Sequence, residues 1–333
     1  MIDRVVSLLQ RVSGGYENYV RFTAMRLVLA PVAHYSLAAG IRCANVIAGF
    51  LVATTAEGAK IRGQMATAFG TDARQSARLA RGWFARQLRD FVYLRRLLTG
   101  RETVRSDAVI HTGSAEAHRL VSQPGPLILA TGHFAREAVI ALVSPGVTPG
   151  PLGQLTNPLP KRSVRPYPLR IALQFGTFLK TQAALRGSAG TFIYVGADGL
   201  AGSELFRFLV KGRAKVTMAV DAPWTRGQPS THERSFAGRA NAAFSVGPAR
   251  LSRLSQAPVV LAIPYADDAG RTVIEWLGPF PPPARDAVAG EAVLLDVLLD
   301  HIEHAVGARP TQYVLQIGGS RRWSAAARQW SPA

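Results

Sequence analysis

Short apolar runs follow one another after Gly125, and most are separated by segments long enough to hold a helix. Parallel strands that are covered by helices on both faces are typically continuous runs of Leu, Ile and Val. A chain with this pattern is restricted to an α/β fold, with a mostly parallel central sheet covered by helices. The runs that predict strands are residues 126–131, 191–195, 215–220, 258–264 and 271–277.

Helices are predicted between and after these runs, at residues 136–143, 164–173, 203–211, 247–255 and 291–306. Residues 138–160, in contrast, contain five prolines and three glycines, which predicts a long loop after the first few positions. The chain has no internal repeat and no linker. We therefore expect one α/β domain at residues 61–333, preceded by a helical, membrane-associating segment at residues 1–60.

Residues 72–98 predict an amphipathic helix with an arginine-rich face. Alanine, leucine and phenylalanine recur there at spacings of three and four. On a helical wheel, the arginines gather within about 80° on the opposite side. They form either a solvated face or a surface that docks a lipid or a carrier protein. We call this set the arginine stripe; it consists of Arg74, Arg78, Arg81, Arg89 and Arg96.

The N-terminal segment contains two apolar stretches, residues 27–41 and 43–56. Each is shorter than the roughly 20 residues that a membrane-spanning helix needs. The apolar run at residues 5–9 is too short for a signal peptide. Because aromatic and aliphatic residues are interleaved with arginines before residue 45, the segment predicts either helices lying in a lipid interface or a pair of core helices.

The formal net charge of +18 indicates an anionic partner, and only five of the 39 lysine and arginine residues are lysines. Nucleic acid, anionic lipid and an acidic carrier protein all have this chemistry. No zinc finger, helix-turn-helix or base-stacking module is present, so we expect no nucleic-acid binding.

No cofactor or metal is predicted. The single cysteine, Cys43, excludes a disulfide framework and a cysteine-based zinc cluster. His301 and His304 lack a third ligand for a metal ion. The sequence contains no Walker A motif, and the glycines at residues 196–202 have the wrong spacing for a dinucleotide-binding loop.

The best candidate for chemistry is His133, in the sequence Thr131-Gly132-His133 at the predicted carboxyl end of a strand. Ligands in open α/β sheets bind at that edge of the sheet. Glu137 follows four residues later and could orient the imidazole, which is the pairing that general-base catalysis uses. A histidine in this position can also be purely structural.

In their order along the chain, several motifs resemble the late acyltransferases of lipid A biosynthesis, the lauroyl/myristoyl transferase family, which is related to mycobacterial phosphatidylinositol-mannoside acyltransferases. The resemblance runs from about residue 55 to about residue 325. The segments that carry it are residues 60–69, Gly132-His133-Phe134, Asn157-Pro158, Arg170, the strand ending at Asp221 after residues 209–212, residues 235–238, 247–249 and 256–260, Pro310-Thr311-Gln312-Tyr313 and Arg321-Arg322-Trp323.

This resemblance implies a glycerolipid-acyltransferase-like fold and transfer of an acyl chain from a thioester to a hydroxyl or amine of a lipid. His133 would be the general base and Glu137 its partner. Acyl carrier protein or acyl-CoA would be the donor, and an anionic membrane lipid the acceptor. A monomer on the cytoplasmic face of a bacterial inner membrane, peripheral or shallowly inserted, is expected. The substrate-binding candidates are Arg136, Asn157, Arg170 and Asp221.

The chain departs from the family pattern at the acidic residue. The family has Asp or Glu five positions after the histidine, where this chain has Ala138, and Glu137 comes one residue early. One residue rotates a helix by about 100°, so Glu137 can be turned away from the imidazole. The other carboxylates that could then support His133 are Asp198, Glu204 and Asp221.

Two other functions compete with acyl transfer. A catalytically silent lipid-binding or scaffold protein would keep the fold and the basic surface, and a hydrolase would pass the acyl group to water. A hydrogen-bonded pair of His133 and a carboxylate at the mouth of an apolar, acyl-sized channel would favour the enzymes, because a general base of this kind needs an acidic partner. A His133 without an acid in reach, or a filled channel, would favour the scaffold.

Overall fold

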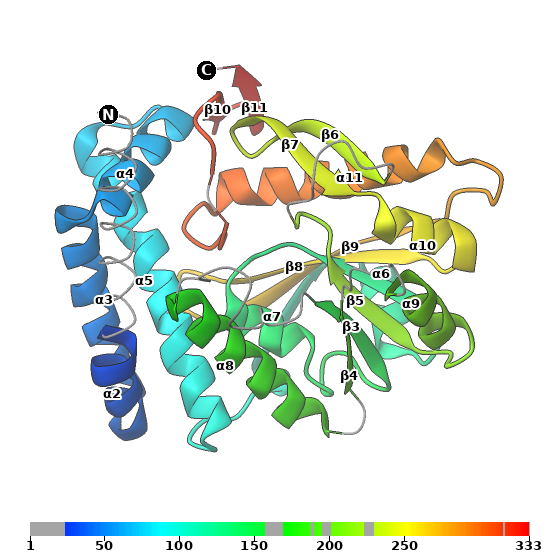
Figure 1. The fold of residues 1–333 in the computed structure, drawn as a ribbon, viewed down its shortest axis with the longest axis horizontal. Helices are drawn as coiled ribbons and strands as arrows, with labels where there is room; N and C mark the ends of the chain where they lie inside the picture. Colours follow the sequence, from blue (N-terminus) through cyan, green and yellow to red (C-terminus); the bar gives the residue numbers. More distant parts are fainter. Residues whose placement is uncertain are drawn as a thin grey trace, which may run out of the picture.

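Among the residues that the structure describes, the central sheet has seven strands and is mostly parallel (Figure 1). A computed structural model describes residues 24–156, 169–187, 190–194, 201–222, 230–315 and 317–332. Strand β9 runs antiparallel to β8 and parallel to β1, and all other neighbours are parallel. The prediction of an α/β fold with a mostly parallel sheet is confirmed. In spatial order, the strands are β1 (Ile110–Gly113), β9 (Thr272–Phe280), β8 (Val259–Ala266), β2 (Leu127–Thr131), β5 (Lys215–Ala219), β3 (Leu152–Thr156) and β4 (Gly190–Tyr194).

Helices cover both faces of the sheet, as the continuous apolar strands require. Successive residues of β2 point to opposite faces: Leu127 and Leu129 join a cluster with α6 and α7, whereas Ile128 and Ala130 join a cluster with α9, α10 and α11. All five residues of β2 are buried. The helices are α2 (Ala30–Tyr35), α3 (Leu37–Thr54), α4 (Ala56–Phe69), α5 (Ala73–Leu98), α6 (Ala115–Ser122), α7 (Arg136–Leu142), α8 (Leu169–Arg186), α9 (Ala201–Val210), α10 (Gly247–Ser255) and α11 (Gly290–Ala308), with a π-helical turn η1 (Ala24–Leu29) and a 3₁₀ turn η2 (Ser106–Ala108).

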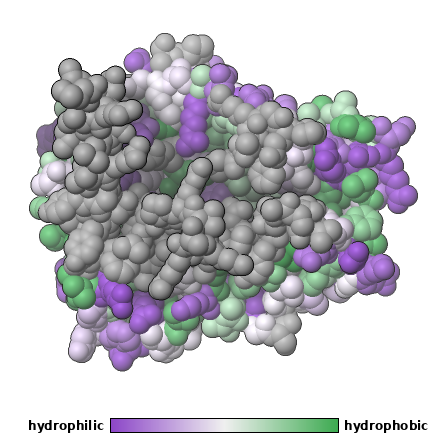
Figure 2. Space-filling model, in the orientation of Figure 1, coloured by the Kyte–Doolittle hydropathy of each residue, from purple (hydrophilic) through white to green (hydrophobic). Residues whose placement is uncertain are grey.

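Most predicted helices are confirmed, and their ends have physical causes. Asp72 caps α5 by accepting the backbone N–H of Gln75 at 2.7 Å. Pro248 occupies the first turn of α10, where its missing N–H costs nothing. On the flank that carries α9, α10 and the start of α11, Figure 2 shows hydrophilic residues interspersed with hydrophobic ones, as expected of amphipathic helices on a sheet.

The predicted loop at residues 138–160 is partly wrong, because it contains β3. This strand lies inside the sheet, between β5 and β4. Its sequence includes Gly153 and Gln154, which dilute the apolar pattern, and a Cβ at position 153 would approach the Phe208 ring to 2.8 Å. Other strands that the sequence pattern did not predict are β1 and the two hairpins, β6 (Thr231–Phe236) with β7 (Arg239–Ser245) and β10 (Arg321–Ser324) with β11 (Gln329–Pro332).

The N-terminal helices pack onto the α/β domain through α5. Ala44, Ala48 and Leu51 of α3 belong to the same hydrophobic cluster as residues of the sheet. Helix α3 continues through Arg42 and so joins parts of the two apolar stretches. Among the described residues, α3 alone is long and apolar enough to cross a membrane, with a mean hydropathy of 1.7 and 28% of its length buried in the protein. This test concerns length and composition only, and the core helix of a soluble protein can pass it as well. Residues 1–23 of the predicted membrane-associating segment lie outside the described residues.

The arginine stripe is not one continuous exposed face. Arg74, Arg78 and Arg81 are exposed. Arg89, in contrast, donates to Asn45 Oδ1 of α3 at 2.6 and 2.9 Å, and Arg96 donates to the carbonyl oxygen of Ala33 at 2.8 Å. The second half of the stripe therefore holds α5 to α2 and α3, because guanidinium groups satisfy polar atoms at this helix interface. Only the first half is available to a partner.

Candidate functional site

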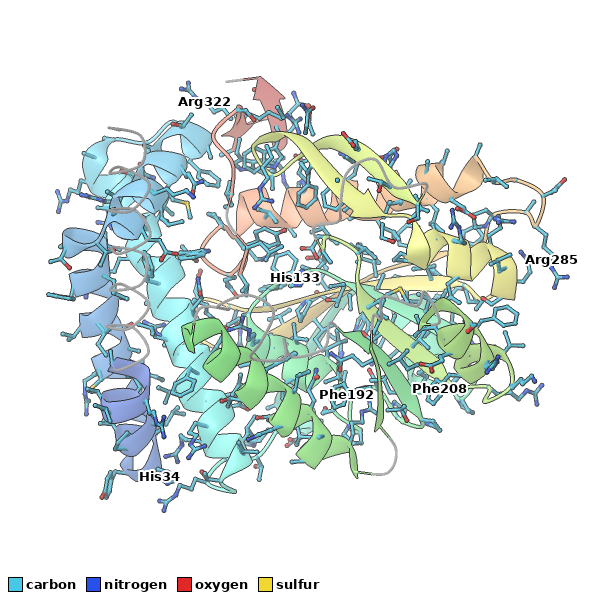
Figure 3. All side chains as sticks on the ribbon, in the orientation of Figure 1. His34, His133, Phe192, Phe208, Arg285 and Arg322 are labelled. Atoms are coloured by element: carbon cyan, nitrogen blue, oxygen red, sulfur yellow. The ribbon has the colours of Figure 1, made fainter. Side chains whose placement is uncertain are left out.

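The candidate site lies at the carboxyl ends of β2 and β5, which are neighbouring parallel strands. Thr131 and Ala219 are partners in register, and the pairing continues one step further because Val220 N–H donates to Thr131 O at 2.9 Å. Gly132 and His133 follow β2, and Asp221 follows Val220 after β5. The sheet therefore brings His133 and Asp221 together at the edge where α/β folds bind ligands. Figure 3 shows His133 at this position.

Asp221 holds His133 by both its ring and its backbone. Asp221 Oδ1 lies 2.7 Å from His133 Nδ1, and Oδ2 accepts the backbone N–H of His133 at 2.9 Å. The Asp221 side chain is completely buried, whereas the His133 side chain is 34% exposed. With Nδ1–H donated to the carboxylate, the other ring nitrogen, Nε2, is the basic atom. The carboxylate thus orients the imidazole through Nδ1, and part of the ring stays accessible to solvent.

Tyr313 completes the support behind His133. Its hydroxyl is hydrogen-bonded to Asp221. The backbone N–H of Val314, the next residue, donates to His133 O at 2.7 Å. The Tyr313 ring also packs edge-on against Phe134, with 5.7 Å between ring centroids. One short segment therefore contacts both members of the pair.

This segment is itself anchored to the sheet and to α5. The side chain of Gln312 accepts Ala266 N–H at 2.7 Å and donates to Ala266 O at 2.6 Å, at the end of β8. Trp83 Nε1 of α5 donates to Tyr313 O at 2.8 Å. Because three elements converge on residues 312–314, the Tyr313 hydroxyl is held in a fixed position.

Two pKa shifts define the charge state of the site. Burial raises the pKa of Asp221, but the charge of His133 and the hydrogen bonds from His133 and Tyr313 outweigh it, so the pKa of this carboxyl lies below its ordinary value. Burial, followed by the neighbouring Asp221 charge, raises the pKa of Tyr313 well above its ordinary value of 10.0. At neutral pH the carboxyl is therefore an anion, and the phenol is a neutral donor.

The predicted pairing of Glu137 with His133 is wrong. Glu137 Oε1 forms an ion pair with Arg86 Nη2 of α5 at 2.5 Å. Helix α7 begins at Arg136, so His133 lies before the helix, and the spacing that brings helical residues four apart together does not apply. Burial raises the pKa of Glu137, and the charge of Arg86 opposes this shift. Asp221, one of the alternatives that the sequence left open, is the partner.

Asp90 anchors the start of α7 near the site. Its Oδ2 accepts the Arg136 backbone N–H at 2.9 Å, and its Oδ1 accepts Arg86 Nε at 3.1 Å. The Asp90 side chain is completely buried on α5. Burial lowers the pKa of the Arg136 guanidinium, against the opposing charge of Asp90. Asp90, Arg86 and Glu137 thus join α7 to α5, and they fix the helix that follows His133.

The other predicted site residues are not brought to His133 by any described contact. Asn157 and Asp198 lie outside the described residues, and the side chain of Arg170 in α8 also lies outside them. Glu204 is exposed on α9. Asp221, predicted to bind substrate, is instead buried behind the imidazole, with its oxygens accepting from His133 and Tyr313. Within the described ranges, no group of three or more His, Cys, Asp or Glu side chains could hold a metal ion.

Sequence reasoning did not select Gln312 or Tyr313 as site residues, although both belong to the Pro-Thr-Gln-Tyr segment that carries the resemblance. The pairing of His133 with Asp221 had a visible sign. Each residue stands two positions after the end of a buried strand, and two such residues meet whenever their strands are neighbours and parallel.

No protein-family model matches the chain, and no curated protein matches it significantly. Function is therefore inferred from the chemistry of the site.

Proposed function

We propose that the chain is an acyltransferase that moves a fatty acyl chain from a thioester donor to a hydroxyl or amine of a lipid or glycolipid acceptor. The observation that carries the proposal is the pair of a buried Asp221 carboxylate and a partly exposed His133 imidazole, 2.7 Å apart. A histidine oriented in this way has the geometry that general-base catalysis uses. The order of the motifs that resemble the lipid A late acyltransferases supports the choice of reaction.

In the proposed reaction, His133 Nε2 removes the proton from the acceptor hydroxyl or amine. The acceptor atom forms a bond to the thioester carbonyl carbon, the C–S bond breaks, and the departing thiolate takes the proton from the imidazolium. Asp221 stabilises the imidazolium while it exists. Proton transfer by a positioned side chain typically contributes about 10²–10⁴-fold to the rate. Arg136 and Arg170 are proposed, from their place in the sequence, to bind substrate or to stabilise the oxyanion.

The proposed donor is acyl carrier protein, with acyl-CoA as the other candidate. Both are anionic, and a net charge of +18 attracts them. The exposed first half of the arginine stripe, Arg74, Arg78 and Arg81, offers a docking surface for an acidic carrier. Encounter with such a carrier should weaken as salt increases, because screening acts on exposed charges. The proposed enzyme acts as a monomer and needs neither metal nor cofactor.

A membrane location on the cytoplasmic face, peripheral or shallowly inserted, is part of the proposal. Large apolar side chains are exposed on η1, α2 and α3: Leu27 is 67% exposed, Tyr35 87%, Val46 70% and Phe50 56%. Arg26 and Arg42 lie in the same helices. Exposed apolar residues interleaved with cations are typical of helices that lie in a lipid interface. Release from membranes by salt alone would support purely electrostatic attachment, and a requirement for detergent would support insertion.

The deciding experiment incubates the full chain with acyl carrier protein thioesters and a bacterial membrane lipid extract, followed by mass spectrometry of the products. We expect an acylated lipid and free carrier thiol in equal amounts. His133→Ala should lower the rate by at least about 10²-fold. His304→Ala is the matched control. His304 lies on α11 and contacts Arg328 and Trp323, not the members of the His133–Asp221 pair, so this variant should retain activity.

Other outcomes identify the competing functions. Release of free fatty acid without an acylated lipid would indicate hydrolysis. Lipid binding without turnover would indicate a scaffold. Full activity of a folded His133→Ala variant, checked by circular dichroism, would exclude His133 as the base.

A further inference from the structure

Strand β1 lies at one edge of the described sheet, and its neighbour there is β9. His111 of β1 is the partner of Ile274 in register, so the side chains of His111 and Trp276 lie on the same face of the sheet. Helix α6, which follows β1, packs against β9 (Figure 1). The attachment of β1 and α6 to the sheet therefore depends largely on their contacts with β9.

Trp276 contacts this edge through both its backbone and its side chain. Its carbonyl oxygen accepts Ser114 N–H at 2.8 Å, just before α6 begins. Its indole Nε1–H donates to His111 Nδ1 at 3.0 Å. A ring nitrogen that accepts a hydrogen bond carries no proton, so this contact requires His111 to be neutral, with its proton on Nε2. Because Trp276 is 1% exposed, water has little room to replace the imidazole as acceptor.

A second imidazole lies on the first. His118 of α6 stacks on His111, with 4.1 Å between the ring centroids and 15° between the ring planes. The Trp276 ring is nearly parallel to both imidazoles, with its centroid 5.9 Å from that of His111 and 5.5 Å from that of His118. Like charges at such a separation disfavour each other, so the stack disfavours protonation of both rings.

The charged groups around the stack do not compensate a charge on His111. Glu275, next to Trp276, lies on the opposite face of the sheet, 3.6 Å from Arg309. Burial, followed by the charge of His118, lowers the pKa of His111, and no described carboxylate opposes this shift. The other charged residues on the elements packed here are Glu116 and Arg119 of α6, both exposed, Asp107 of η2, which lies 3.7 Å from Arg105, and Arg136 and Glu137 of α7, of which Glu137 pairs with Arg86.

We propose that His111, His118 and Trp276 form an acid-sensitive clasp that holds β1 and α6 to β9. At neutral pH, His111 accepts the indole N–H. In acid, a proton on His111 Nδ1 turns the acceptor into a donor that faces another donor, and the new charge lies against the stacked His118. Both changes weaken the same contact, so β1 and α6 loosen from the edge of the sheet.

The pH range of the clasp follows from the direction of the shift. The pKa of His111 is lower in the folded protein than its unfolded value of about 6.5. The unfolded chain therefore binds this proton more readily. The stabilisation by the clasp is complete above about pH 6.5, and it is lost as pH falls through the folded pKa.

The test combines two measurements on the full chain between about pH 7.5 and about pH 5. In NMR spectra, the indole N–H resonance of Trp276, assigned from Trp276→Phe, should move together with the titration of His111. In hydrogen exchange, the protection factors of residues 110–122 should fall at least about tenfold, which corresponds to one pKa unit. Those of the buried strand β2 should stay constant.

His111→Asn is the decisive variant. The Asn Oδ1 atom stands close to the position of Nδ1 and accepts the indole N–H, but it does not titrate, so the loss of protection in acid should disappear. His118→Phe keeps a stacked ring without a charge, and it should move the acid transition to higher pH because the pKa of His111 rises. His34→Asn changes a histidine of α2 and is the matched control, expected to respond to acid like the wild type.

A Trp276 indole resonance that stays constant over this pH range would overturn the proposal. So would an unchanged acid response in a His111→Asn variant that circular dichroism shows to be folded. If His111→Asn does not fold, an acid transition of His118→Phe at the wild-type pH overturns the proposal instead. These outcomes are independent of acyl transfer, since none of the variants touches His133, Asp221 or Tyr313.

Discussion

Two histidine–aspartate pairs with nearly equal contact distances occupy very different surroundings. His133 Nδ1 lies 2.7 Å from Asp221, and His232 Nε2 lies 2.8 Å from Asp296, on hairpin β6–β7 and helix α11. The Asp221 side chain is completely buried, whereas that of Asp296 is 41% exposed. Asp296 also accepts from Arg234 at 3.0 Å. The distance alone would make the two pairs equivalent.

The difference shows what turns such a pair into a candidate catalytic dyad. The Asp221 charge is directed at His133, since its other described side-chain partner is the neutral Tyr313. The Asp296 charge is shared with a guanidinium and screened by water, so it does little to an imidazolium. The bound nitrogen differs as well: Asp221 holds Nδ1 and leaves Nε2 outward, whereas Asp296 occupies Nε2. Burial, exclusive pairing and ring orientation therefore separate the two pairs.

The largest expected effect is that of Asp221→Asn. Loss of the negative charge removes the stabilisation of the imidazolium, and we expect the rate of acyl transfer to fall by about 10²-fold or more, measured as kcat with an acyl carrier protein donor. Glu137→Gln is the control, because Glu137 pairs with Arg86 and should affect kcat by less than about threefold. A larger loss in Glu137→Gln than in Asp221→Asn would reverse the assignment of the partner.

Acid should destabilise the wild type more than it destabilises Asp221→Asn. A carboxyl whose pKa falls on folding binds fewer protons in the folded state, so its stabilisation is present above the unfolded pKa of about 3.9 and is lost as pH falls through the folded pKa. Urea denaturation from pH 7 to pH 3 should therefore show the two proteins converging in free energy of unfolding. A difference that stays constant over this range would contradict a lowered pKa at Asp221.

Much of the fold was predictable, because the apolar composition of the central strands indicates that they are buried. Strands β2 and β8 appear as nearly unbroken apolar runs, and β5 is buried over its first four residues although it contains Lys215 and Thr217. Strand β3 was missed because its residues Gly153 and Gln154 leave no apolar run. The space beside Gly153 is filled by Phe208 from α9, and that contact exists only in the folded protein.

The candidate site was half predictable for a related reason. His133 was visible because a strand end is a local feature. Its partner depends on strand order, since β2 and β5 are neighbours although 88 residues separate His133 from Asp221. Glu137, which is close to His133 in the sequence, was the predicted partner. This prediction was wrong because the helix begins after the histidine. Tyr313 is even further from His133 in the sequence, and its contact with Asp221 depends on how residues 312–314 are anchored to β8 and α5.

Tyr313→Phe should have an intermediate effect. It removes one hydrogen bond to Asp221 but leaves the pair with His133 intact, so we expect a loss of about 1 kcal/mol in stability and a decrease in kcat of at most about tenfold. The proton resonance of His133 Nδ1–H should shift, because the carboxylate that accepts it becomes more basic. A loss of activity as large as that of Asp221→Asn would mean that Tyr313 contacts the substrate instead of positioning the aspartate.

The smallest effect is expected from Asp296→Asn, which breaks the comparison pair. Arg234 keeps its contacts with Asp300 at 2.6 Å and Glu303 at 3.2 Å, so the hairpin stays tied to α11. An exposed ion pair contributes about 0–1 kcal/mol, and we expect that range for the change in free energy of unfolding, with kcat unchanged. Chemical denaturation and the acyl-transfer assay measure both quantities. If Asp296→Asn lowered kcat as Asp221→Asn does, burial and exclusive pairing could not be what distinguishes the two pairs, and the case for His133 as the base would lose its physical ground.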